Sequence, residues 1–127
     1  MPKVLNIVET AYRATLEEQD DTAVWISFML KKAGLDSDVL LRGNAVNYAV
    51  KGQDASGLKF GEWVQTHPPD LPRDLGILMG AGAKVFYLKD DLGDRGINED
   101  ELVDGISAID GAGLAALFDG YDQVWSW

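Results

Sequence analysis

Polar and charged side chains follow three short apolar segments of this sequence, residues 3–8, 38–41 and 84–88. They are Glu9, Tyr12 and Arg13 after the first segment, Arg42, Asn44 and Asn47 after the second, and Lys89 and Asp90 after the third. If the segments are parallel strands, these side chains meet at the edge of the sheet where α/β proteins bind ligands. The pattern therefore predicts a small-molecule or anion site at that edge.

Arg42 is the side chain in this set that best suits an anion. A short helix is expected to begin at Gly43 and Asn44, so its first backbone N–H groups and the guanidinium would act together. A second interpretation uses the same residues: Glu9 pairs with Arg13 or Arg42 as a structural salt-bridge cluster or a subunit contact. The sequence leaves both interpretations open.

Thiol chemistry is excluded because the chain contains no cysteine. This absence removes disulfides, thiolate nucleophiles, persulfide carriers and cysteine-based metal sites. His67 is the single histidine and lies beside Pro68–Pro69, without the partners of a metal site or a catalytic triad. We therefore expect no metal and no cofactor.

The sequence contains two stretches that resemble ligand-binding loops, one for phosphate and one for calcium, but neither has its residues at the required positions. Gly80 and Gly82 precede an expected strand, whereas a phosphate-binding loop follows one, so these glycines are predicted to end a helix. If the acidic stretch 90–101 is aligned to an EF-hand calcium loop with Gly96 at the sixth position, Arg95 and Leu102 occupy ligand positions. Neither side chain can bind calcium. That stretch is predicted to be a solvated loop with helix caps.

The charge balance limits the possible partners. Eleven basic residues stand against 21 acidic ones, giving a net charge of −10, which disfavours nucleic acid and anionic membranes. The first residues lack the apolar core of a signal peptide, which predicts a cytoplasmic protein. A length of 127 residues fits a single domain.

The periodicity of apolar residues predicts an α/β fold, a three-layer α/β/α sandwich with a mainly parallel sheet of about five strands. The expected strands cover residues 3–8, 38–41, 84–88, 106–109 and 124–127. Helices are expected over 22–33, from about 72 to 79 after an Asp70 cap, and after Asp110. Asn98 and Glu101 have the spacing of a capping box.

Two segments suggest assembly. In the first helix Ile26, Met29, Leu30 and Ala33 recur at helical spacing, and Val24, Trp25 and Phe28 widen the apolar stripe beyond one face, as at a subunit interface. The segment at about 52–69 has no clear periodicity and is expected to be a long loop or arm. Trp63 in this segment is expected to close over the site or over a neighbouring subunit.

The segment from Gly82 to Gly105 resembles the C-terminal half of DsrE/DsrF-like proteins, a family associated with intracellular sulfur oxidation and sulfur relay. The matching residues are Arg95-Gly96-Ile97, Glu101-Leu102 and Gly105. The order of the other elements also follows the family, so the resemblance covers nearly the whole chain. It implies the three-layer fold, a homo-oligomer (a trimer or hexamer) and a pocket beneath Leu88.

Leu88 stands where the thiol-bearing members have their sulfur-accepting cysteine, so sulfurtransferase activity does not carry over. The first hypothesis is a non-catalytic DsrE-like protein that binds a small ligand or protein partner in a sulfur-metabolism setting. Arg42, Asn44, Asn47 and Lys89 would then contact the ligand, Glu9 and Arg13 would orient them, and Leu88 would form the pocket floor. The alternatives are an enzyme using carboxylate or lysine acid–base chemistry, and a structural subunit that pairs with a cysteine-bearing homologue.

Overall fold

The fold of the chain was obtained as a computed structural model that describes residues 2–12 and 21–127. Its centre is a five-stranded sheet in the order β6-β5-β2-β1-β7, in which every neighbouring pair is parallel. The strands are β1 (Lys3–Val8), β2 (Asp36–Leu41), β5 (Val85–Leu88), β6 (Ser107–Ile109) and β7 (Gln123–Ser126). The predicted α/β fold with a mainly parallel sheet is confirmed.

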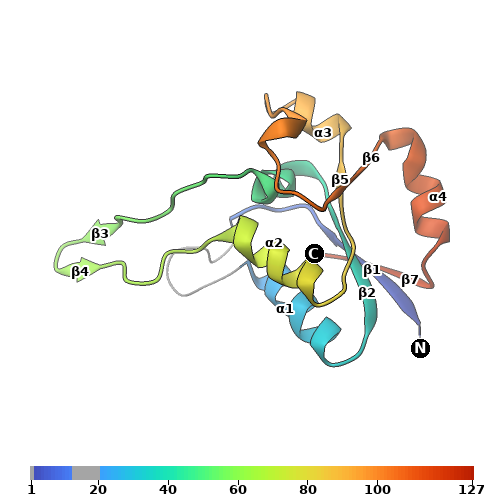
Figure 1. Cartoon of the computed structure of the whole chain (residues 1–127), viewed down its shortest axis with the longest axis horizontal. Coiled ribbons are helices and arrows are strands. Elements are labelled where there is room, and N and C mark those ends of the chain that lie inside the picture. The colour runs from blue at the N-terminus through green and yellow to red at the C-terminus, as the bar shows by residue number, and fades with distance from the viewer. Residues whose placement is uncertain (1, 13–20) are drawn as a thin grey trace.

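Helices cover both faces of this sheet (Figure 1). α1 (Thr22–Lys32) and α2 (Leu71–Gly80) lie beside each other on one face, and α4 (Leu114–Asp119) lies on the other. α3 (Asp90–Gly93) is a single turn after β5, and short 3₁₀ segments cover Gly43–Ala49, Glu99–Glu101 and Gly111–Gly113. None of the helices in the described part of the chain is long and apolar enough to cross a membrane.

The alternation of side chains along the central strands divides the core between the two faces. Val8, Val39 and Leu41 belong to the larger cluster under α1 and α2. Leu5, Ile7 and Leu40 form a smaller cluster, against which Phe86 and the apolar side chains of α4 pack. β1 and β2 are thus buried on both faces, which explains their nearly continuous apolar sequence.

Side-chain caps begin the helices at the predicted positions. Asp70 accepts a hydrogen bond from the backbone N–H of Arg73 at 3.2 Å, and Asp110 accepts one from Gly113 at 2.8 Å. Glu101 accepts from the Asn98 N–H at 2.9 Å in a complete capping box. These contacts satisfy N–H groups that a helix start leaves without partners.

The wide apolar stripe of α1 did not indicate which of its residues face the core. Ala23, Val24 and Ser27 are buried, while Trp25 and Met29 are exposed. The small side chains at 23 and 27 allow the helix to approach its neighbours closely, whereas Phe28 is only partly buried against the core. The apolar stripe of α1 is therefore divided between the core and the surface.

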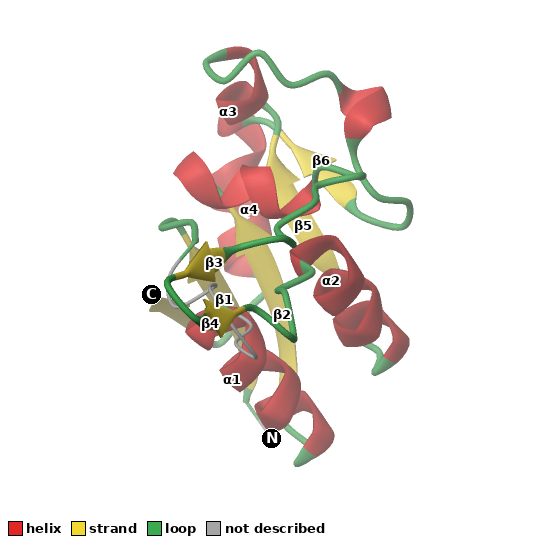
Figure 2. Ribbon diagram, turned by 90° about the vertical axis from the view of Figure 1, so that its left-hand side faces the viewer, coloured by secondary structure: helices red, strands yellow, loops and turns green. Residues whose placement is uncertain are grey.

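The segment between the 3₁₀ turn at 43–49 and α2 extends as a long arm (Figure 1), which points toward the viewer in Figure 2. Its far part forms an antiparallel hairpin of β3 (Lys59–Phe60) and β4 (Trp63–Val64). Sequence periodicity gave no sign of these strands because each contains two residues, too few to show a period. Gly61, at the turn, has φ +57°, a conformation that glycine adopts without strain.

Candidate functional site

The loops that follow β1 and β2 meet at the carboxyl edge of the sheet. The Arg42 N–H donates to the Val8 carbonyl at 3.0 Å, and the Ala45 N–H donates to the Glu9 carbonyl at 3.2 Å. Gly43 has φ +58°, and a Cβ atom on it would lie 3.2 Å from the Glu9 carbonyl oxygen. Glycine thus allows the second loop to lie directly against the first.

Glu9 and Arg42 form an ion pair at this edge. Arg42 donates from Nε to Glu9 Oε1 at 2.8 Å and also from Nη2 to the same oxygen. Their side chains are 43% and 30% exposed, so the pair is open to solvent on one side. An anion that bound Arg42 here would have to compete with the Glu9 carboxylate. The other predicted residue of the first loop, Arg13, lies outside the described residues.

The amide side chains of the second loop are also engaged internally. Asn44 Oδ1 accepts two hydrogen bonds from the guanidinium of Arg95, at 3.1 and 2.9 Å. Asn47 Nδ2 donates to the Asn44 carbonyl at 2.8 Å, and Asp91 accepts from the Gly43 N–H at 2.5 Å. These contacts fasten α3 and the turn after it to the loop after β2. No pattern in the sequence indicated a role at this edge for Arg95 or Asp91.

Lys89 belongs to a separate group of side chains beyond β5. Its ammonium lies 3.1 Å from Glu99 Oε1, and the Tyr87 hydroxyl donates to Glu99 Oε2 at 2.8 Å. Burial of Tyr87, together with its hydrogen bond to the carboxylate, raises the pKa of the phenol to about 12. The hydrogen bonds from Tyr87 and then from Lys89 lower the pKa of Glu99. In the described part of the chain, no hydrogen bond or ion pair joins Lys89 to Glu9 or Arg42.

Leu88 ends β5 and is half-buried. Strand alternation places it on the same side of the sheet as Phe86, the side covered by α4. A cleft of about 250 Å³ near this end of β5 is lined by Tyr87 and by residues of the 99–106 segment, but not by Leu88. The expected pocket beneath Leu88 does not correspond to this cleft.

A buried cluster of Asp21 and Tyr48 was missed by sequence analysis. Asp21 Oδ1 accepts from the N–H groups of Ala23 and Val24, at 2.8 and 3.2 Å, and Oδ2 accepts from the Tyr48 hydroxyl. The same hydroxyl accepts from the Tyr12 N–H at 2.5 Å. One phenol thus connects the loop after β1 to the start of α1. The acidic residue before a helix was the only signal for this cluster, and it predicted no tyrosine partner.

His67 lies at the base of the arm. Its Nδ1 is 3.0 Å from the Thr66 hydroxyl oxygen, and it lines an open cleft of about 440 Å³ with Asp54, Asp70 and Arg73 among its neighbours. Within residues 2–12 and 21–127, no group of three or more histidine or carboxylate side chains is arranged to hold a metal ion.

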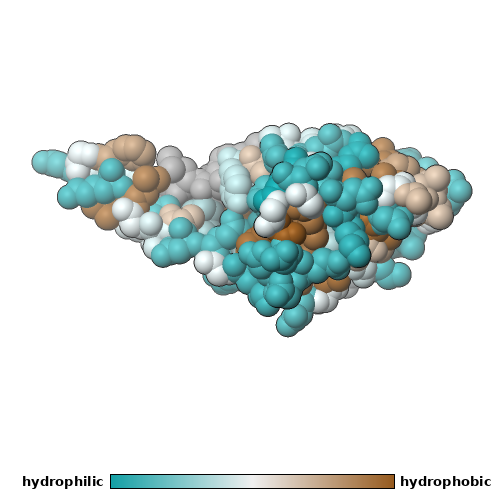
Figure 3. Space-filling model, turned by 90° about the horizontal axis from the view of Figure 1, so that it is seen from above, coloured by the Kyte–Doolittle hydropathy of each residue, from teal (hydrophilic) through white to brown (hydrophobic). Residues whose placement is uncertain are grey.

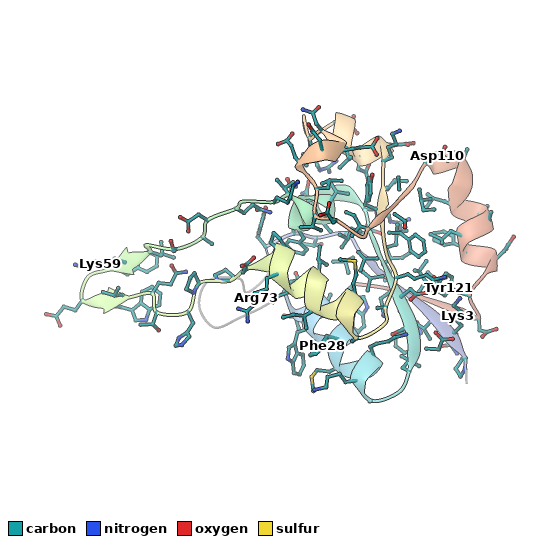
Figure 4. The ribbon with its side chains drawn as sticks, in the orientation of Figure 1. Lys3, Phe28, Lys59, Arg73, Asp110 and Tyr121 are labelled. Carbon is teal, nitrogen blue, oxygen red and sulfur yellow. The ribbon has the colours of Figure 1, made fainter. Side chains whose placement is uncertain are left out.

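A largely apolar groove lies between α1 and α2. It encloses about 190 Å³ and is lined by Val24, Trp25, Phe28, Asp74 and Ile77. Trp25 and Ile77 are 49% and 41% exposed. Figure 4 shows Phe28 on α1 and Arg73 at the beginning of α2, which mark the two helices that form this surface. We call it the α1–α2 groove.

Comparison with known proteins gives relatives by structure alone. No family model matches the sequence, and no curated protein matches it significantly. The ychN protein from E. coli superposes with a TM-score of 0.74 at 23% sequence identity, covering 100% of both chains. BT1422 from Bacteroides thetaiotaomicron, a conserved protein of unknown function, gives 0.68 at 13% identity over 98% of this chain and 95% of its own.

MTH1491 from Methanobacterium thermoautotrophicum, also of unknown function, gives a TM-score of 0.59 at 14% identity over 98% and 99% of the two chains. The chain therefore has the same α/β fold as these proteins over its whole length. At these identities the likeness concerns the fold.

Proposed function

We propose that this chain is a non-catalytic DsrE-like protein that acts by binding another protein through the α1–α2 groove. The observation that carries the proposal is the groove itself, with Trp25 and Ile77 both more than 40% exposed on neighbouring helices. Contiguous exposed apolar surface of this kind marks interaction sites, and tryptophan is enriched at the centres of protein interfaces.

A protein partner fits the chain better than a small anion. The strongest candidate for anion binding, Arg42, already has Glu9 as its partner. The Asn44 side chain accepts from Arg95 in the same region. The polar groups at the strand ends thus satisfy one another, whereas the apolar side chains of the groove have no cover among the described residues.

The resemblance of segment 82–105 to DsrE/DsrF-like proteins supports a setting in sulfur metabolism. Without cysteine the chain has no group that could accept a sulfane sulfur as a persulfide. A binding role is compatible with that setting, since a partner can supply the thiol. A cysteine-bearing homologue is therefore one partner that the experiment must be able to detect.

Site-specific photocrosslinking in the native host tests the proposal. A photoreactive amino acid replaces Trp25 or Ile77 in the groove, and Val124, 41% exposed on β7, serves as the control position. We expect covalent protein adducts from positions 25 and 77 in higher yield than from position 124, with the partner identified by mass spectrometry. Groove positions that crosslink no more than position 124 would contradict the proposal.

A further inference from the structure

The hairpin of the arm carries three apolar side chains that are exposed to solvent. Phe60, Trp63 and Val64 are 60%, 39% and 53% exposed. The Phe60 and Trp63 rings stack on each other, with centroids 5.7 Å apart and an interplanar angle of 26°. Figure 3 shows hydrophobic side chains on this projecting part of the molecule.

The arm stands away from the helices that form the groove. Figure 1 shows the hairpin far from α1, and in Figure 4 Lys59 marks its outer end, opposite Phe28 and Arg73 on the body. Beside the hairpin, the Gln65 N–H donates to the Leu58 carbonyl at 2.9 Å, which joins the two sides of the arm. In this arrangement the stacked rings do not reach the groove of their own chain.

A hairpin with two residues in each strand has little stability of its own in water. Three exposed apolar side chains at its tip add to the cost of leaving it uncovered. Burial of the tip against another surface would remove both costs. The surface required is apolar and concave, and the α1–α2 groove has these properties.

Each surface has, beside its aromatic rings, one charged side chain of opposite sign to one on the other surface. Lys32 lies at the edge of the groove, with its ammonium 5.5 Å from the centroid of the Phe28 ring. Glu62 is in the hairpin turn, directly before Trp63. Neither Lys32 nor Glu62 has an ion-pair partner within the described chain. If the stacked rings entered the groove against Phe28, the Glu62 carboxylate would approach the Lys32 ammonium.

We infer that the arm of one copy docks its Phe60–Trp63 pair into the α1–α2 groove of a second copy. The inference rests on the proposed function of the groove as a protein-binding surface and names the partner. Each chain carries one arm and one groove, so the contact either is exchanged between two copies or closes a ring. The Glu62–Lys32 pair fixes the direction in which the hairpin enters.

Analytical ultracentrifugation tests both sides of the contact. The wild-type chain is expected to self-associate. Trp63→Ala on the arm and Trp25→Ala in the groove should each weaken self-association on the order of 30-fold, as for a central aromatic of an interface. Because both side chains are exposed, circular dichroism of each variant should match that of the wild type.

A charge exchange tests the pairing itself. Glu62→Lys and Lys32→Glu should each weaken self-association on the order of 10-fold, and the double variant should recover most of the loss. Lys84→Glu is the matched control, since Lys84 is exposed and Lys84→Glu makes the same charge change at the start of β5. It should leave the association constant unchanged.

A monomeric wild type would overturn the inference. So would an association constant that is the same in the wild type, the arm variant and the groove variant. A charge exchange without recovery would also overturn it. Crosslinks from position 25 to a different protein, with the wild-type chain monomeric, would leave the proposed function standing while removing the second copy as the partner. No crosslink from the groove at all would remove both.

Discussion

Arg42 directs two of its N–H groups at a single carboxylate oxygen of Glu9, which lies 33 residues earlier in the chain. The two side chains come from adjacent parallel strands, at the paired ends Val8 and Leu41. The sequence suggested that Arg42 is free to bind an anion at this edge. In the structure its charge is neutralised by Glu9. The exposed side of the pair nevertheless leaves the guanidinium reachable from solvent.

Glu9→Gln should therefore turn this edge of the sheet into a better anion site. Removal of the carboxylate charge leaves Arg42 without its ionic partner, and we expect sulfate to bind about 10-fold more tightly than in the wild type. Calorimetric titration with sulfate measures the difference. Asp119→Asn removes one carboxylate charge at the exposed end of α4 and should bind sulfate as the wild type does. Equal affinities in all three proteins would show that Glu9 does not control Arg42.

Tyr48→Phe should destabilise the fold. The substitution removes the hydroxyl that donates to the buried Asp21 carboxylate and accepts from the Tyr12 N–H. The buried Asp21 carboxylate and the half-buried Tyr12 N–H each lose a partner, and we expect the free energy of unfolding to fall by about 2 kcal/mol. Urea denaturation followed by tryptophan fluorescence gives the value.

Tyr12→Phe is the matched control for that measurement. The Tyr12 hydroxyl binds Gln53 Oε1 at 2.6 Å on the exposed side of the loop, so its loss should cost less than about 1 kcal/mol. If Tyr48→Phe were no more harmful than Tyr12→Phe, the phenol of Tyr48 would not be a structural link between the first loop and α1.

The raised pKa of Tyr87 predicts a loss of stability in alkali. The phenol has a pKa near 10 in the unfolded chain and about 12 in the fold, because burial and the Glu99 carboxylate both disfavour the phenolate. The neutral phenol therefore stabilises the fold below pH 10, and this contribution is lost as the pH rises from 10 to 12.

Urea unfolding between pH 8 and 11.5 should thus show a steeper decline above pH 10 for the wild type than for Tyr87→Phe. Tyr121, whose pKa is also raised, chiefly by burial and then by its hydrogen bond to Asp38, is present in both proteins and cancels from the comparison. Parallel declines would mean that Tyr87 does not hold its proton more tightly in the fold.

Leu88→Cys tests where the carboxyl end of β5 lies. Leu88 is half-buried, so we expect a cysteine there to react with a maleimide in the folded protein. Leu40→Cys, on the same face of the sheet and fully buried, should react only when the protein opens. Mass spectrometry of timed samples gives both rates without interference, because the wild-type chain has no thiol. Equal rates would contradict the placement of Leu88 at an accessible strand end.

Local features of the fold were predictable from the sequence. The five strands of the main sheet, the longer helices and the caps at Asp70, Asn98 and Asp110 all lie close to their expected positions. Each of these features depends on apolar periodicity or on a side chain within three residues of the helix start. The inward face of α1 could not be assigned from the sequence, because an apolar stripe wider than one face does not show which part of it meets the core.

The partners of the polar side chains were less predictable. Glu9 had two possible cationic partners in the sequence, Arg13 and Arg42. Arg95 had no assigned role at this edge until the structure placed it against Asn44. Tyr48 carried no signal for its bond to Asp21, 27 residues away. Spacing along the chain does not determine such contacts, since they form only after the loops at one sheet edge have packed together.

The sequence alone determined the class of fold and excluded thiol chemistry, because strand and helix periods are local and the absence of cysteine is a matter of composition. The tertiary structure decided which charged side chains form ion pairs and which apolar side chains remain exposed to solvent. Both outcomes depend on distances between segments far apart in the chain, and those distances exist only once the sheet has been assembled with the arm projecting beyond it.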